Sequence, residues 1–220
     1  MDTSTLVSLL SEGLVQTLYM TLVATLMAYV IGLPVGVSLI VTSPNGIHPM
    51  GVYNKIMGFI VNVLRSVPFL ILMIALMPYI RAVIGTGIGT SATTAALVVA
   101  AAPFVARMVE QSLLEVDSGV IEAAQSMGAS NMQIIRKVML LEARPSLLNG
   151  AAVATITILG YSAMAGSIGG GGLGDIAIRY GLYRFQPTTM WITVVILVVL
   201  VQIMQEIGVR LAAKLDNRIN

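Results

Sequence analysis

Long uncharged apolar runs alternate with short polar segments along this chain of 220 residues. A helix needs about 20 apolar residues to cross the hydrocarbon core of a membrane, and several of the runs approach or exceed that length. Continuous runs are typical of membrane helices, whereas the strands of membrane β-barrels alternate in short segments. The pattern therefore predicts an all-α polytopic membrane protein with one membrane domain, over residues 13–210. We expect five transmembrane helices, at approximately 14–41, 56–78, 92–114, 147–168 and 190–209.

The overall composition agrees with a membrane protein. Hydrophobic residues make up 57% of the chain, charged residues 10%, and the mean hydropathy is +0.92. In soluble domains about a quarter of the residues are charged. The chain has no cysteine and one histidine, His48, so we expect no disulfide, no thiolate chemistry and no metal site.

Lysine and arginine are distributed unevenly between the two ends of the predicted spans, and this bias sets the orientation of a membrane protein. One side holds eight of them: Lys55, Arg107, Arg136, Lys137, Arg144, Arg210, Lys214 and Arg218. The other side holds three: Arg81, Arg179 and Arg184. Arg65 is assigned to neither side. We therefore expect the N-terminus outside and the C-terminus in the cytoplasm.

A polar, helix-forming segment at 118–141 separates the third run from the fourth. Ser130 and Gln133 have the spacing of a capping box, in which each residue bonds to the other's backbone N–H. Gly128 suits the left-handed position that closes a helix. We expect a helix–glycine–helix elbow on the cytoplasmic side, offered to a partner. An amphipathic helix that rests on the membrane surface is the alternative.

The elbow contains four residues with the spacing of a known motif: Glu122, Ala123, Ala124 and Gly128. They resemble the EAA loop of ABC importer permeases, E-A-A-x(3)-G-x(9)-I-x-L-P. Val138 stands at the position of the isoleucine, and Leu141 at that of the proline. In that family the loop forms a coupling helix that docks on the ATPase subunit. The resemblance implies this role for the four residues, and the two small alanines would let a partner approach closely.

Two further segments resemble the permease of methionine ABC importers: RSVPF at 65–69, and GYSAM at 160–164 with the glycines after it. The resemblance covers nearly the whole chain and implies the type I ABC importer permease fold. It implies import of methionine, of either enantiomer or of derivatives, across the bacterial cytoplasmic membrane.

The implied partners are two cytosolic ABC ATPase subunits, an extracytoplasmic methionine-binding protein and the lipid bilayer. A second copy of the chain is expected because five spans are too few to enclose a pathway. No G-x-x-x-x-G-K-[ST] motif occurs, so we expect ATP to bind to the partner, with no catalytic residue and no cofactor here. No nucleic acid is expected as a partner.

Four residues are candidates for the pore or gate. Met164 lies beside small residues with Tyr161 and Ser162 just before it, and we expect a constriction there. Arg65 lies about ten residues into the second run. An arginine that faces hydrocarbon costs several kcal/mol, so we expect it to line a cavity or an interface. Snorkelling to the membrane surface is the alternative.

Four glycines follow the fourth run: Gly169, Gly170, Gly171 and Gly172. We expect a hinge where the fourth span unwinds near the pore, and a flexible external loop is the alternative. A formal G-x-G-x-x-G occurs here, but no strand precedes it, so dinucleotide binding is rejected.

Three other functions remain open at this point. The same architecture could import another small polar solute. An ATP-independent channel or carrier is disfavoured, because no acidic pair lies within a predicted span. The third is a membrane scaffold that anchors a cytosolic enzyme.

Overall fold

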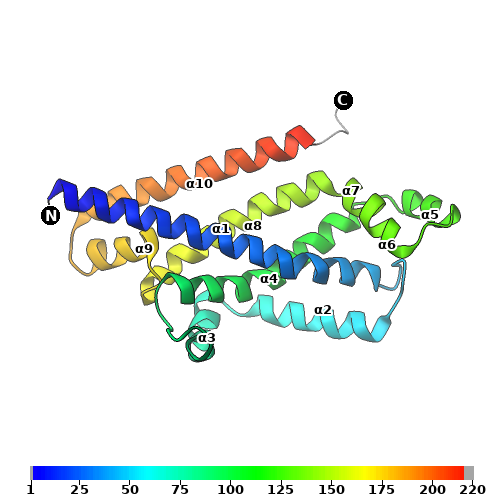
Figure 1. The fold of residues 1–220 in the computed structure, drawn as a ribbon, viewed down its shortest axis with the longest axis horizontal. Helices are drawn as coiled ribbons and strands as arrows, with labels where there is room; N and C mark the ends of the chain where they lie inside the picture. The colour runs from blue at the N-terminus through cyan, green and yellow to red at the C-terminus, as the bar shows by residue number, and fades with distance from the viewer. Residues whose placement is uncertain (1, 216–220) are drawn as a thin grey trace.

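The structure is a computed structural model, and it describes residues 2–215. Four long helices run roughly along one direction and form the body of the molecule (Figure 1): α1 (Thr3–Val41), α4 (Thr90–Leu114), α8 (Arg144–Ala165) and α10 (Pro187–Leu215). Each belongs to a stretch long and apolar enough to cross a membrane. All regular elements of the described part are helical, so the predicted fold class is confirmed. Arg218, one of the charges used for the orientation, lies outside the described residues.

Helix α1 begins at Thr3, well before residue 14, where the first span was expected to start. The turns in front of the expected start mix polar residues with leucines that pack against α9, and the Gln16 side chain donates a hydrogen bond to the Glu12 carboxylate at 3.0 Å. Pairs four residues apart support a helix outside lipid as well as within it. The apolar run therefore marks only part of this helix.

The centre of the molecule is the contact between α1 and α4. The face of α1 that is buried there carries small residues at every fourth position: Ala24, Ala28, Gly32 and Gly36. A Cβ atom on Gly36 would lie 2.5 Å from the carbonyl oxygen of Ala106 on α4. Small residues let two membrane helices approach until their backbones almost touch, and this approach compensates for the weak hydrophobic drive in lipid.

The second apolar run, expected to hold a span at 56–78, is not one straight helix. It forms α2 (Gly51–Ser66) and α3 (Phe69–Ile84), which meet at an angle of 104°. Pro68 lies at the break and pushes the residue before it, Val67, into an extended conformation at φ −81° and ψ 125°. The protein has five spans if this bent pair is counted as one.

Short elements connect the long helices. The elbow comprises α5 (Ser118–Ser126), α6 (Asn131–Ile134), a π-helical turn η1 (Ile135–Met139) and α7 (Leu140–Glu142). A second group after α8 comprises a 3₁₀ turn η2 (Gly166–Ile168), α9 (Gly172–Ile176) and a π-helical turn η3 (Ala177–Leu182). In Figure 1 the elbow and the link from α1 to α2 lie at one end of the molecule, and the N-terminus and α9 lie at the other.

Candidate functional site

The elbow starts and turns where its local sequence predicts. The Asp117 carboxylate accepts a hydrogen bond from the Gly119 N–H at 2.6 Å and so caps the start of α5. Gly128 has a φ of +79°, the left-handed conformation expected after a helix. Its N–H donates to the Gln125 carbonyl at 2.9 Å, and the Ala129 N–H donates to the Ala124 carbonyl at 3.1 Å. These bonds close α5 as a rigid corner.

The second half of the elbow begins with the predicted capping box. The Gln133 N–H donates to Ser130 Oγ at 3.4 Å, and the Ser130 N–H donates to Gln133 Oε1 at 2.8 Å. The box is therefore confirmed. Further on, Pro145 lies in the first turn of α8, where a proline loses no helical hydrogen bond.

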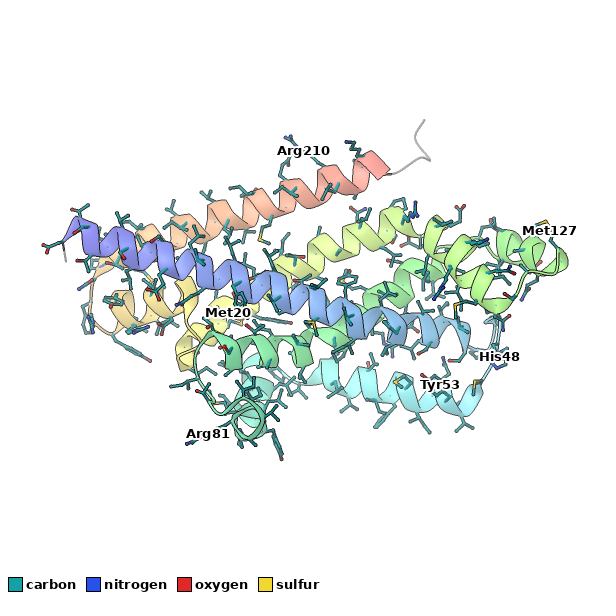
Figure 2. All side chains as sticks on the ribbon, viewed as in Figure 1. Met20, His48, Tyr53, Arg81, Met127 and Arg210 are labelled. Carbon is teal, nitrogen blue, oxygen red and sulfur yellow. The ribbon has the colours of Figure 1, made fainter. Side chains whose placement is uncertain are left out.

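The four motif residues divide between the two faces of the elbow. Ala124 is only 5% exposed and packs into the main hydrophobic core, so the expectation that both alanines face a partner is wrong for this one. Glu122, Ala123 and Gly128 are exposed. Met127, at 81% exposure, extends away from the helices at the far end of the elbow (Figure 2). The outer face thus combines small apolar groups with a carboxylate.

Beside this outer face lies a cleft of about 280 Å³ between α5 and the link from α1 to α2. Glu122 and Gln125 line it from the side of α5, and Asn45 and Ile47 line it from the side of the link. The Glu122 side chain therefore borders a hollow that a side chain of a docking protein could enter. No pattern in the sequence indicated that the link from α1 to α2 would line a cleft beside the elbow.

The pore candidates on α8 have different surroundings. Met164 is 55% exposed, and Tyr161 is half-buried. The Tyr161 ring stacks on Phe69, the first residue of α3, with ring centroids 4.5 Å apart. Ser162 is buried, and its hydroxyl donates to the Leu159 carbonyl at 2.8 Å, so it faces the interior of the subunit. Arg65 is exposed near the end of α2.

The glycine segment after α8 is an anchored turn, in contrast to the flexible loop that was the alternative. Gly169, Gly171 and Gly172 have φ values between +76° and +80°, which side chains rarely permit. The Gly89 N–H donates to the Gly169 carbonyl at 2.9 Å, and the Thr93 hydroxyl donates to the Gly170 carbonyl at 3.2 Å. These bonds fix the turn to the start of α4.

Helix α1 holds the other side of the same turn. The Gly172 N–H donates to Gln16 Oε1 at 2.8 Å, and the Leu173 N–H donates to Thr17 Oγ1 at 2.9 Å. All five residues of α9 are buried. The chain thus reverses direction within a fixed, well-packed turn. The hinge role of these glycines stays a prediction.

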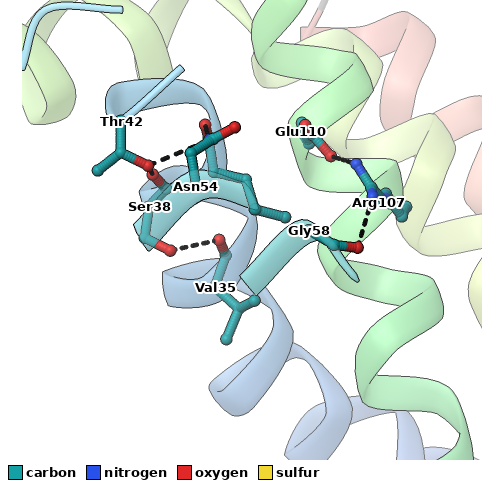
Figure 3. A network of polar contacts seen from close by, with 8 residues as sticks. Val35, Ser38, Thr42, Asn54, Gly58, Arg107 and Glu110 are labelled. Atoms are coloured by element: carbon teal, nitrogen blue, oxygen red, sulfur yellow. Dashed lines mark hydrogen bonds and ion pairs between the residues drawn. The ribbon is translucent and has the colours of Figure 1, made fainter. Parts of the chain in front are cut away.

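One polar network was not singled out from the sequence. The Arg107 guanidinium on α4 donates to Glu110 Oε2 at 2.6 Å and to the Gly58 carbonyl on α2 at 3.0 Å (Figure 3). Nearby, the Asn54 amide donates to the Leu39 carbonyl at 2.6 Å. These bonds join α1, α2 and α4 near the elbow. From the sequence, the spacing of Arg107 and Glu110 indicates the ion pair between them but not the hydrogen bond to α2.

Comparisons with known proteins agree with this geometry. The family model described as "Binding-protein-dependent transport system inner membrane component" matches residues 28–217. The chain is 50% identical over 203 residues to the probable D-methionine transport system permease protein MetI of Vibrio cholerae, covering 92% of this chain and 90% of that protein. It is 49% identical over 158 residues to the D-methionine transport system permease protein MetI of Escherichia coli, covering 72% and 73%.

Two solved structures have a similar fold. A chain from a structure described as inward-facing conformations of the MetNI methionine ABC transporter superposes with a TM-score of 0.96 at 45% identity, covering 99% of this chain and 100% of that one. A chain from an amino acid ABC transporter with histidines superposes with a TM-score of 0.73 at 22% identity, covering 99% of both chains. The second likeness supports the fold alone.

Proposed function

Because the chain belongs to the family of binding-protein-dependent transport system inner membrane components, we propose that it is the permease subunit of an ATP-driven methionine importer. The elbow at 118–141 carries this proposal. It is a capped, rigid corner between two spans, and its outer face offers the Glu122 carboxylate beside Ala123. The similarity to D-methionine permeases along most of the chain supports methionine as the solute.

The proposed transporter contains two copies of this chain, two cytosolic ATPase subunits and an extracytoplasmic methionine-binding protein. ATP binds to the ATPase subunits, which close on each other and draw the two elbows together. Because a short link joins α5 to α4, and α6 leads through η1 and α7 into α8, that movement reaches the membrane helices and opens the pathway outwards. ATP hydrolysis resets the subunits. The permease itself catalyses no reaction.

We propose further that the N-terminus is outside and the C-terminal end of α10 is in the cytoplasm. The excess of lysine and arginine on one side supports this orientation. The elbow and the link from α1 to α2, which belong to that side, lie at the same end of the molecule (Figure 1).

Replacement of Gly128 tests the coupling role of the elbow. Proline has a φ near −65° and cannot adopt the +79° of this position, so Gly128→Pro should disrupt the corner without changing any span. The tagged permease would be purified with its ATPase partner, and methionine uptake would be measured in liposomes. We expect membrane insertion to persist. Association with the ATPase and methionine uptake should both fall at least about tenfold, which corresponds to a loss of about 1.4 kcal/mol in binding free energy.

Gly51→Ala is a matched control, because Gly51 begins α2 with nothing within 4 Å of an added Cβ. This variant should assemble and transport normally. Normal assembly and uptake by Gly128→Pro would contradict the coupling role. A parental complex that imports no methionine would contradict the proposed solute.

A further inference from the structure

Helix α2 carries a group of polar side chains that nothing in the described part of the chain covers. Lys55, Asn62 and Ser66 recur at helical spacing on it, and Arg65 adjoins them. All four are exposed. The opposite side of the helix is apolar, and Val61 and Leu64 line a groove there with residues of α1 and α4. Thus α2 packs through Val61, Leu64 and the hydrogen bonds of Asn54 and Gly58, and these four polar side chains stay uncovered beside exposed apolar ones such as Phe59.

Arg65 lies deep in the membrane by the geometry of the neighbouring helices. The hydrogen bond from Arg107 to Gly58 places these two residues at one level of α4 and α2. A helix rises about 1.5 Å per residue, so Arg65 lies roughly 10 Å beyond that level along α2. Along α4, Thr90 at the outer end lies roughly 25 Å beyond the same level. Arg65 is therefore about 15 Å short of the outer end, close to the middle of a core about 30 Å thick. Phosphate groups of lipids lie at the surfaces of that core.

Among residues 2–215, no acidic side chain lies at this depth to neutralise Arg65. Among the described residues, no hydrogen bond or ion pair involves it. Three acidic residues form ion pairs with arginines three or four residues away: Glu110, Asp175 and Glu206. The remaining described acids lie in the first turns of α1 or from the end of α4 to the end of the elbow: Asp2, Glu12, Glu115, Asp117, Glu122 and Glu142. Asp216 lies outside the described residues. A second copy offers the same set, so the counter-charge must come from elsewhere.

We infer that the polar face of α2 lines the solute pathway and that the Arg65 guanidinium binds the carboxylate of the solute as it passes. This inference rests on the proposed function, because methionine carries a carboxylate. A planar guanidinium donates two parallel hydrogen bonds to a carboxylate, and such charge-assisted pairs are among the strongest hydrogen bonds. Charged side chains within membranes face water-filled cavities or the interior of a bundle, which agrees with a pathway between two copies. Arg65 thus selects for an anionic group in a solute with an apolar side chain.

The test uses the complete transporter in liposomes, with the ATPase partner, the binding protein and methionine. The chain has no cysteine, so Arg65→Cys provides a single reactive site in it. We expect methionine uptake by Arg65→Cys to fall at least about tenfold, since a hydrogen bond to a charged group is lost. ATPase stimulation by the loaded binding protein should persist. Aminoethyl methanethiosulfonate, which restores a positive charge, should recover uptake, whereas the sulfonatoethyl reagent should not.

Three controls complete the experiment. Arg81→Cys removes another exposed arginine from the same bent pair of helices, and it should transport normally. The parental complex treated with both reagents reports any reaction on the partner proteins. Liposomes of phosphatidylcholine alone remove anionic lipid, and parental uptake should not fall there to the level of Arg65→Cys.

Several results would overturn the inference. Full uptake by Arg65→Cys would show that the guanidinium is dispensable, and a thiol that resists both water-soluble reagents would show that it faces lipid. A parallel loss of uptake and ATPase stimulation, without recovery by aminoethylation or in Arg65→Lys, would indicate a structural role. Parental uptake that depends on anionic lipid would assign the counter-charge to a phosphate. Failure of the parental complex to import methionine would instead refute the proposed function.

Discussion

Backbone segments approach each other closely where the chain turns from α8 into α9. A Cβ atom on Gly166 would collide with the backbone of Gly174 and Asp175, and one on Gly174 would collide with the backbone of Ala163. Backbone atoms cannot move aside as the end of a flexible side chain can. The sequence shows that these glycines are numerous, but the segments that approach them depend on the folded chain.

Gly166→Ala should therefore destabilise the protein by about 1–3 kcal/mol or more, because the new methyl group overpacks a turn that has no free space. Gly160→Ala is the comparison: Gly160 lies in α8, six residues before Gly166, and nothing lies within 4 Å of its added Cβ. In a helix interior, alanine is favoured over glycine by about 0.5–1 kcal/mol. Thermal unfolding of the detergent-solubilised variants should show a lower transition for Gly166→Ala and an unchanged or higher one for Gly160→Ala. Equal transitions would contradict this packing.

Among the helices, the attachment of α2 to the bundle depends strongly on one arginine. Only Val61 of α2 is buried, so apolar packing holds this helix weakly. Arg107 adds a charge-assisted hydrogen bond to the Gly58 carbonyl and orients itself through Glu110. A bond of this kind is stronger at partial burial than in bulk water, because fewer water molecules compete for the donors.

Arg107→Gln should lower the free energy of unfolding by about 1.5–3 kcal/mol, the range for a hydrogen bond to a charged group. Amide hydrogen exchange should rise in α2 more than in α8, because only α2 loses an attachment. Glu110→Gln leaves the bond to Gly58 available and should cost less. A double-mutant cycle measures the coupling between the two side chains. Unchanged exchange in α2 would refute the role of Arg107 as an attachment point.

How well an element could be predicted from sequence depends on how local its causes are. The corner at Gly128 and the Ser130 cap follow from contacts within four residues, and both were predicted correctly. The break at Pro68 was missed, because apolar residues continue on both sides of it. Hydropathy does not show where a helix axis bends. The burial of Ala124 was also missed, since it depends on the helices behind the elbow.

For the whole molecule, the orientation in the membrane can be tested with two single cysteines. Ser4→Cys and Ala213→Cys place exposed thiols near the two ends of the described chain, in a protein that has no other cysteine. With the N-terminus outside, a membrane-impermeant maleimide should label Cys at position 4 in intact cells. It should label position 213 only after the membrane is permeabilised. The reverse pattern would contradict the proposed orientation, and both variants should retain methionine uptake.

At this scale the apolar runs predicted the number of spans, and the charge bias predicted which loops share a side. The pathway between two copies could not be located from the runs. Its proposed place follows from the helix face that stays uncovered after folding. On α2 that face carries Lys55, Asn62 and Arg65, and it could be recognised as uncovered only once the folded positions of α1 and α4 were known.

The turn at Gly172 also has a consequence for biosynthesis. Gln16 and Thr17 accept hydrogen bonds from backbone groups that lie 156 positions later in the chain. Since a ribosome makes the N-terminal part first, α1 enters the membrane long before these donors exist. Within α1 these side chains bond only to Glu12 and to the Gly13 carbonyl, and their contacts to the turn must wait until the fourth span and the turn after it have been inserted. A nascent chain that stops before residue 172 therefore lacks both contacts that fix the N-terminal half of its first helix, and such a fragment should be recognised by membrane quality control as unfinished.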